Sequence, residues 1–119
     1  MPLNNVGKKL MLDALTAVVD YLSLHSADPG ATGTSELAGG SPAYARKAVT
    51  WNAAVDPGTA TGNSLPTFDV EGGDTVSYVG LWDAVTSGAF YGSANVTDEV
   101  FGGQGTYQVT AATLSITDS

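Results

Sequence analysis

The chain has 119 residues and a mass of 12.0 kDa, which is the size of one domain. Hydrophobic residues make up 43% of the sequence, which predicts a folded core and excludes a disordered chain. Twelve acidic residues against four basic ones give a formal net charge of −8, and such a surface repels the phosphate backbone of a nucleic acid. The absence of cysteine excludes disulfides and thiolate metal sites. No apolar run approaches the ~20 residues of a membrane span, so we expect neither a nucleic acid nor a membrane as partner.

A helix over about residues 5–19 is the first element that the sequence predicts. Asn4 or Asn5 can cap its start by accepting a hydrogen bond from an amide of the first turn. Apolar residues recur at helical spacing along one face, namely Val6, Leu10, Met11, Ala14, Leu15, Val18 and Leu22. Polar residues occupy the opposite face, namely Lys9, Asp13, Thr16 and Asp20. The apolar face must cover either the chain's own β core or a neighbouring subunit, and the sequence leaves both readings open.

Beyond Asp20 the spacing of apolar residues changes from 3.6 to 2, which predicts a strand through Leu22 and Leu24. The turn sequence Asp28-Pro29-Gly30 then opens a polar loop over about residues 28–42, and a second Asp-Pro-Gly at 56–58 opens a loop through about residue 64. The other predicted strands cover residues 44–51, 65–70, 75–82, 89–96, 105–109 and 113–117.

Short strands at this spacing predict a mainly β fold, an antiparallel β-sandwich resembling a jelly roll, preceded by the single amphipathic helix. Residues 1–20 would form the N-terminal arm and helix, and residues 21–119 one sandwich domain. The residues expected to be largely buried are Leu22, Leu24, Val49, Phe68, Val79, Leu81, Leu114 and Ile116.

No group of residues predicts catalysis, a cofactor or a metal site. His25 is the single histidine, and a catalytic triad needs side chains that converge from separate elements, so a structural histidine at a strand edge is expected. Most carboxylates lie in turn sequences, where aspartate bonds its own backbone. The run Gly102-Gly103-Gln104-Gly105 lacks the Lys-Ser/Thr of a phosphate loop and predicts a hairpin turn or bulge.

Aromatic residues offer one further reading. Trp51, Trp82, Tyr78 and Tyr91 would form a platform for glycans if their rings gathered on the surface. Burial of the two tryptophans in the core is the alternative reading.

Several runs of the sequence resemble a known family. These runs are Leu-His-Ser-Ala-Asp-Pro-Gly at 24–30, Gly-Gly at 39–40 leading to Tyr-Ala-Arg at 44–46, Val-Gly-Leu-Trp-Asp at 79–83, and Phe-Gly-Gly-Gln-Gly-Thr-Tyr at 101–107. Nearly the whole chain is similar to small bacteriophage virion proteins of actinobacterial phages, whose members are called minor capsid, head decoration or tail fibre proteins. The resemblance implies a structural protein without catalysis that is incorporated in the virion. Asp13 interrupts the first apolar stretch and no convincing cleavage site follows it, so we expect the chain to be made in the host cytoplasm without a signal peptide.

The resemblance itself leaves head and tail open. Because the chain is short and has none of the long repetitive shaft segments usual in a tail fibre, we expect a capsid decoration protein on the outside of the phage head. The alternative is a minor tail, tail-fibre or tail-tip protein that binds glycans. As partners we expect the major capsid protein and further copies of the chain, in a trimer or a dimer. The candidate contact residues are Asn4, Asn5, Lys8, Lys9, Met11 and Leu15 in the helix, with Arg46 and Lys47 in reserve.

Overall fold

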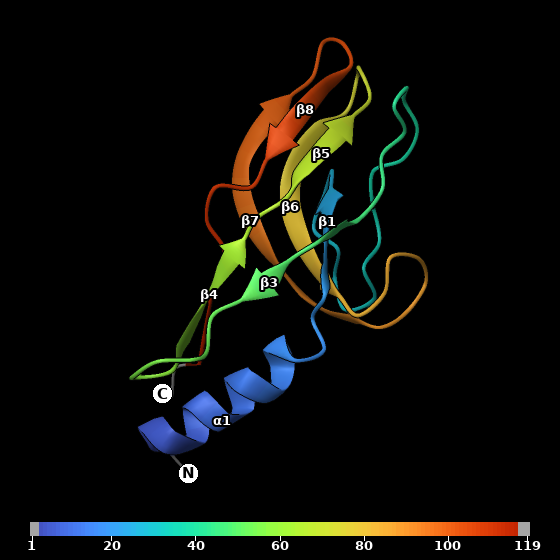
Figure 1. Ribbon diagram of the computed structural model, residues 1–119. Coiled ribbons are helices and arrows are strands. Elements are labelled where there is room, and N and C mark those ends of the chain that lie inside the picture. Colours follow the sequence, from blue (N-terminus) through green and yellow to red (C-terminus); the bar gives the residue numbers. More distant parts are fainter. Residues whose placement is uncertain (1–2, 117–119) are drawn as a thin grey trace.

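The computed structural model describes residues 3–116, and its ribbon is shown in Figure 1. One helix precedes all the strands, and the fold is mainly β, as the sequence predicts. The elements in chain order are α1 (Asn5–Thr16), β1 (Tyr21–His25), β2 (Lys47–Ala48), β3 (Thr50–Trp51), β4 (Thr59–Ser64), β5 (Thr67–Val70), β6 (Thr75–Trp82), β7 (Phe90–Val100), β8 (Gly105–Gln108) and β9 (Thr113–Ser115).

Two open layers form a sandwich-like fold. One layer is an antiparallel sheet with the strand order β2-β1-β6-β7. The other layer combines the pair β5-β8 with the three strands β3-β4-β9. β4 leads into β5 and β8 leads into β9, so these strands follow one another as a long ribbon. The part of the ribbon with β5 and β8 lies over the four-stranded sheet, and the part with β4 and β9 runs on toward α1 (Figure 1).

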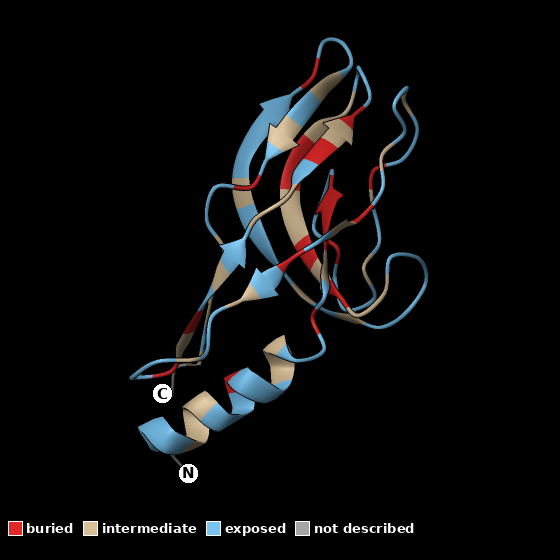
Figure 2. Ribbon diagram, viewed as in Figure 1, coloured by how far each residue is buried: buried red, intermediate tan, exposed pale blue. Residues whose placement is uncertain are grey.

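The hydrophobic core lies between the two layers. Phe68 and Val70 of β5 meet Leu22 and Leu24 of β1, and all four are fully buried. Four of the residues expected in the core are buried as predicted, namely Leu22, Leu24, Val49 and Phe68. Figure 2 shows that the buried residues gather on β1, β5 and β6, while β7 is mostly exposed. In α1, Leu12 is the buried residue, and the others are half-buried or exposed.

Four other residues that the sequence places in the core are only half-buried: Val79, Leu81, Leu114 and Ile116. The first three lie along the side on which the two layers stand open. Strand alternation therefore assigned them correctly to the inner face, but the sandwich does not close over them. Ile116 follows β9, at the end of the ribbon away from the core.

The loop expected up to residue 64 contains a strand instead. β4 is made of Thr, Gly, Asn and Ser around one buried residue, Ala60, so its sequence carries little strand signal. The strand forms because β3 and β9 pair with it on its two sides. The strand predicted over 44–51 is broken into β2 and β3, which belong to different layers.

The glycine run at 102–105 is not a hairpin. It connects β7 of the four-stranded sheet to β8 of the opposite layer, so the strands on its two sides are not hydrogen-bonded neighbours. At this turn the chain passes from one layer to the other. A turn signal in the sequence does not distinguish such a connection from a hairpin.

α1 begins as the sequence predicts and ends earlier. The Asn4 side chain accepts a hydrogen bond from the Gly7 amide at 2.8 Å, which is the expected N-cap. The helix ends at Thr16 rather than near residue 19, and Val19 turns into the protein, where it is fully buried. Among residues 3–116, no helix is long and apolar enough to span a membrane.

α1 is rotated about its axis relative to the prediction. The face that was expected to be polar and exposed is the one that contacts the body. Lys9 pairs with Asp56 at 2.7 Å, and the Asp13 carboxylate accepts a hydrogen bond from the Ala54 amide at 2.9 Å. Leu12, which is 1% exposed, is the buried residue of the helix. The apolar stripe therefore points mainly away from the chain's own core.

Candidate functional site

His25 belongs to a buried chain of hydrogen bonds that starts at Trp82. The indole Nε1 of Trp82 donates to Ser23 Oγ at 2.8 Å, and Ser23 Oγ lies 2.6 Å from His25 Nε2. His25 Nδ1 lies 2.8 Å from the Thr34 carbonyl oxygen, which only accepts, so Nδ1 carries a proton. Burial lowers the pKa of His25, which favours the neutral ring, and Nε2 then accepts the Ser23 hydroxyl proton.

His25 does not lie at a sheet edge, where the sequence predicted it. β1 is an inner strand between β2 and β6, and Ser23 and His25 are both fully buried. They are two positions apart on one strand and so share a face, which brings a serine and a histidine together without any substrate space beside them. The hydrogen bonds hold the loop around Thr34 against the sheet.

Arg46 has a similar structural role, which separates it from the other candidate contact residues. Its side chain is 8% exposed and makes a two-point pair with Glu36, at 2.9 and 3.0 Å. Its Nη1 donates to the carbonyl oxygens of Ala84 and Ser87 at 3.0 and 2.7 Å. The guanidinium carbon lies 3.5 Å from the centre of the Trp82 ring. Arg46 therefore joins two loops from within, and its guanidinium is not offered to a partner as the sequence suggested.

Tyr44 completes this cluster. Its hydroxyl donates to Glu36 at 2.7 Å and accepts from the Leu24 amide at 3.0 Å. Burial is the main reason that the pKa of Tyr44 is raised, and the nearby Glu36 raises it further. The hydroxyl therefore keeps its proton, which the hydrogen bond to the Glu36 carboxylate requires.

The other candidate contact residues lie where the helix meets the body or beside it. Asn4 caps α1 and Asn5 is exposed on its first turn. Lys8 is half-buried and comes so close to Gly58 that a Cβ at that glycine would be 2.8 Å from the Lys8 Cβ. The remaining four residues are Met11, which is exposed, and Lys9, Leu15 and Lys47, which are half-buried. Of these, Lys9 pairs with Asp56, as described above.

One continuous apolar surface on α1 is left uncovered. Val6 is 69% exposed, Leu10 71% and Met11 53%, and Ala14 is exposed beside them. Val18, which follows the helix, is 41% exposed. We call these five residues the N-terminal apolar face. Exposing the N-terminal apolar face to water does not stabilise a monomer, so this face is a candidate contact surface.

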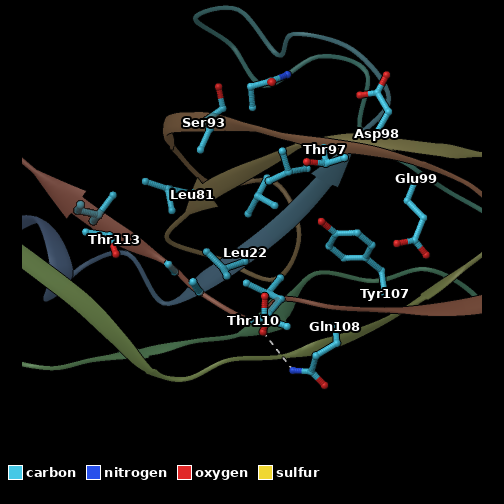
Figure 3. A pocket seen from close by; sticks show the side chains of 18 of the residues that line it. Leu22, Leu81, Ser93, Thr97, Asp98, Glu99, Tyr107, Gln108, Thr110 and Thr113 are labelled. Carbon is cyan, nitrogen blue, oxygen red and sulfur yellow. Dashed lines mark hydrogen bonds between the residues drawn. The ribbon is translucent and has the colours of Figure 1, made fainter.

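A second uncovered apolar surface lies between the layers, on the side where they stand open. This groove has a volume of about 700 Å³ and is formed by β6 and β7 on one side and β8, β9 and their connection on the other (Figure 3). We call it the interlayer groove. Its apolar lining is Leu22, Trp51, Val79, Leu81, Val96, Val109 and Leu114.

The rim of the interlayer groove is polar and acidic. Asp98 and Glu99 of β7 lie on one side, and Tyr107 and Gln108 of β8 lie on the other (Figure 3). Burial and the negative charge of Glu99 both raise the pKa of Tyr107, so its hydroxyl stays protonated. No lysine or arginine is among the residues that line the groove. The groove therefore suits a ligand that is apolar in the middle and neutral or positive at its edges.

The four aromatic residues considered for glycan binding do not form one exposed platform. Trp82 is 6% exposed, and the Trp51 indole nitrogen donates to the Val19 carbonyl oxygen at 2.9 Å. Tyr78 is half-buried and Tyr91 is exposed on β7, where its hydroxyl bonds Asp83. Within residues 3–116, no three or more histidine or carboxylate side chains lie together so that they could hold a metal ion.

Comparison with known families decides the kind of protein. Residues 5–117 match the family described as "Podophage GP4 fiber I protein gp80". The chain belongs to this family. The match covers the helix and all nine strands, so it describes the whole fold rather than one motif. Neither the curated proteins nor the solved structures contain a match to the chain.

Membership in this fibre family makes the chain a bacteriophage virion protein, as the sequence resemblance implied. The fibre family agrees with the alternative reading, a tail-fibre protein, better than with a capsid decoration protein. The sequence signals missed the interlayer groove, because its lining comes from strands that are distant in the chain.

Proposed function

We propose that this chain is a structural subunit of a phage fibre, and that it contributes attachment surfaces rather than catalysis. The observation that carries this proposal is the match of residues 5–117 to a family of fibre proteins. Two uncovered apolar surfaces on one small fold support it, because a subunit that acts within an assembly needs surfaces that a free monomer does not.

The shape of the molecule also supports a fibre subunit. Its principal extents are 47 × 25 × 24 Å, and the Cα radius of gyration is 14.9 Å. A compact chain of this length has a radius of gyration of about 13.5 Å. The elongation comes from the ribbon of β4 and β9 and from α1, which extend beyond the four-stranded sheet (Figure 1).

The buried position of the one histidine supports a role without catalysis. Ser23 and His25 are closed inside the sheet, where their hydrogen bonds to Trp82 and Thr34 are already complete. Replacing His25 by Gln should leave incorporation of a folded protein into virions intact. Loss of incorporation by a folded variant would contradict this part of the proposal.

Localisation in the virion tests the proposal directly. Antibodies against the purified protein, bound to intact virions and seen by electron microscopy, should mark fibres or the tail. Label spread over the head would contradict the fibre proposal and would favour the capsid exterior, with the major capsid protein as partner. The sequence resemblance also implies an actinobacterial host, which is a separate prediction. Identifying the bacterium that the phage infects would test it.

A further inference from the structure

We propose that copies of this chain bind one another, with the N-terminal apolar face of one copy packed in the interlayer groove of the next. The inference deepens the proposed function by naming a partner for both surfaces. The inference can nevertheless be tested separately from the proposed function, because experiments on the purified protein test it without a virion. The arrangement is head-to-tail, since two different surfaces meet.

The first argument is that, within residues 3–116, nothing of the same chain covers either surface. α1 contacts β4, and no residue of α1 lines the groove. Leu10 is 71% exposed on the helix, while Leu81 and Leu114 are half-buried on the groove lining. One head-to-tail contact would remove both apolar surfaces from water in every copy, which is the main favourable term in protein association.

The second argument is the spacing of the anchors. Val6, Leu10 and Ala14 follow one another four residues apart, and Met11 and Val18 widen the same face. An amphipathic helix that lies in a groove uses anchors at this spacing. The 12 residues of α1 make a helix about 18 Å long, so several anchors can enter one groove together.

The third argument is charge. Two copies with a net charge of −8 repel each other unless the contact joins their least acidic parts. α1 holds Lys8, Lys9 and Asp13, and Lys9 is already paired with Asp56 of its own chain, so the helix is not itself an acidic surface. The groove has Asp98 and Glu99 on its rim and no basic residue in its lining. Packing α1 into the groove therefore brings one of the least acidic parts of one copy to the acidic rim of another.

Pairing of two α1 helices is the competing arrangement. It would leave the interlayer groove of both copies open to water. A head-to-tail contact between different surfaces closes into a ring or continues as a filament, depending on the rotation from one copy to the next. Either form lets one surface pair build an assembly of many copies.

Sedimentation equilibrium over a range of protein concentrations tests whether the association exists and which surfaces it uses. Leu10→Asp on the helix and Ala94→Arg on the exposed groove rim should each weaken association about tenfold or more. Their controls are Val85→Asp and Ala31→Arg, which make the same chemical changes at exposed positions outside both surfaces and should stay within about twofold. Circular dichroism verifies that each variant is folded. A wild-type protein that is monomeric at every concentration overturns the proposal.

Cysteine cross-linking tests the arrangement, and the natural absence of cysteine makes it specific. Leu10→Cys and Val96→Cys proteins are oxidised separately and as a mixture, and the products are identified by mass. The head-to-tail contact predicts a cross-linked dimer only in the mixture. Cross-linking of Leu10→Cys with itself to the same extent would overturn the proposal in favour of helix pairing. Association that neither surface variant weakens would overturn it in favour of another surface.

Discussion

Individual side chains in this protein act mainly by completing buried hydrogen bonds. Gly80 shows how closely they fit. A Cβ at Gly80 would lie 2.4 Å from Ser23 Oγ and 2.7 Å from His25 Nε2. Only glycine leaves room for the hydrogen bonds that run from Trp82 to Thr34.

We therefore predict that Gly80→Ala lowers the free energy of unfolding by about 1–3 kcal/mol, because the added methyl group forces the Ser23 and His25 side chains apart. Urea unfolding measures the loss. Gly102→Ala is the matched control, because nothing lies within 4 Å of a Cβ at Gly102 and no left-handed backbone angle is required there. Equal losses in the two variants would show that crowding at Ser23 is not the cause.

Acid should weaken the fold through His25. Burial lowers the pKa of His25 in the folded protein, so the unfolded chain binds a proton more readily. The stabilising contribution is complete above the ordinary histidine pKa of about 6.5 and is lost as the pH falls through the lower folded pKa. Unfolding free energies measured near neutrality and at about pH 5.5 should fall more for the wild type than for His25→Gln. A fall of the same size in both proteins would assign the effect to carboxylates.

The Arg46–Glu36 and Lys9–Asp56 ion pairs should differ greatly in their contribution to stability. Arg46 is buried with all three guanidinium nitrogens hydrogen-bonded, so Arg46→Ala should cost about 3–5 kcal/mol by leaving the half-buried Glu36 carboxylate without its cation. The Lys9–Asp56 pair is 34% and 65% exposed, and Lys9→Ala should cost no more than about 1 kcal/mol. Urea unfolding of both variants decides this, and similar costs would contradict the structural role assigned to Arg46.

At the scale of the elements, α1 is the part whose packing differs most from its pattern. The widest apolar arc of the helix would ordinarily face the core. Here the docked face uses Leu12 with the polar contacts of Lys9 and Asp13, because the body offers a polar loop at this place. Gly58 in that loop allows the close approach of Lys8.

Two leucines two positions apart on the helix test this orientation. Leu12→Ala should lower the free energy of unfolding by about 2–5 kcal/mol, because it removes a buried side chain. Leu10→Ala should change it by no more than about 0.5 kcal/mol in dilute solution, where copies are separate. A larger loss from Leu10→Ala than from Leu12→Ala would contradict the observed rotation of α1.

At the scale of the whole molecule, the shape follows from the ribbon of β4, β5, β8 and β9. One half of the ribbon covers the four-stranded sheet, and the other half carries α1 away from it (Figure 1). The result is an elongated monomer with one apolar surface on the helix and another where the layers stand open.

Small-angle X-ray scattering in dilute solution should therefore report an elongated particle, with a radius of gyration above the about 13.5 Å of a compact chain of this length. Raising the protein concentration should increase the particle size for the wild type and not for Leu10→Asp. A compact profile in dilute solution would show that α1 or the ribbon folds back onto the sheet.

Local patterns were sufficient for much of this fold. Alternation in Leu22 and Leu24, the turn signals and the Asn4 cap predicted β1, the sandwich class and the start of the helix. These features depend on neighbours within a few residues, which is the range over which a sequence determines structure directly. The same range explains why Trp82 and Thr34, the partners of the Ser23–His25 pair, were not foreseen.

Only the tertiary structure decided the features that matter for binding. β4 exists because two distant strands pair with it, and α1 is rotated because a distant loop supplies partners for Lys9 and Asp13. The interlayer groove exists because Val79 and Leu114, from opposite layers, are left half-covered on the same side. Each of these depends on contacts between residues far apart in the chain, and the period of a local pattern carries no information about which distant surface it will meet.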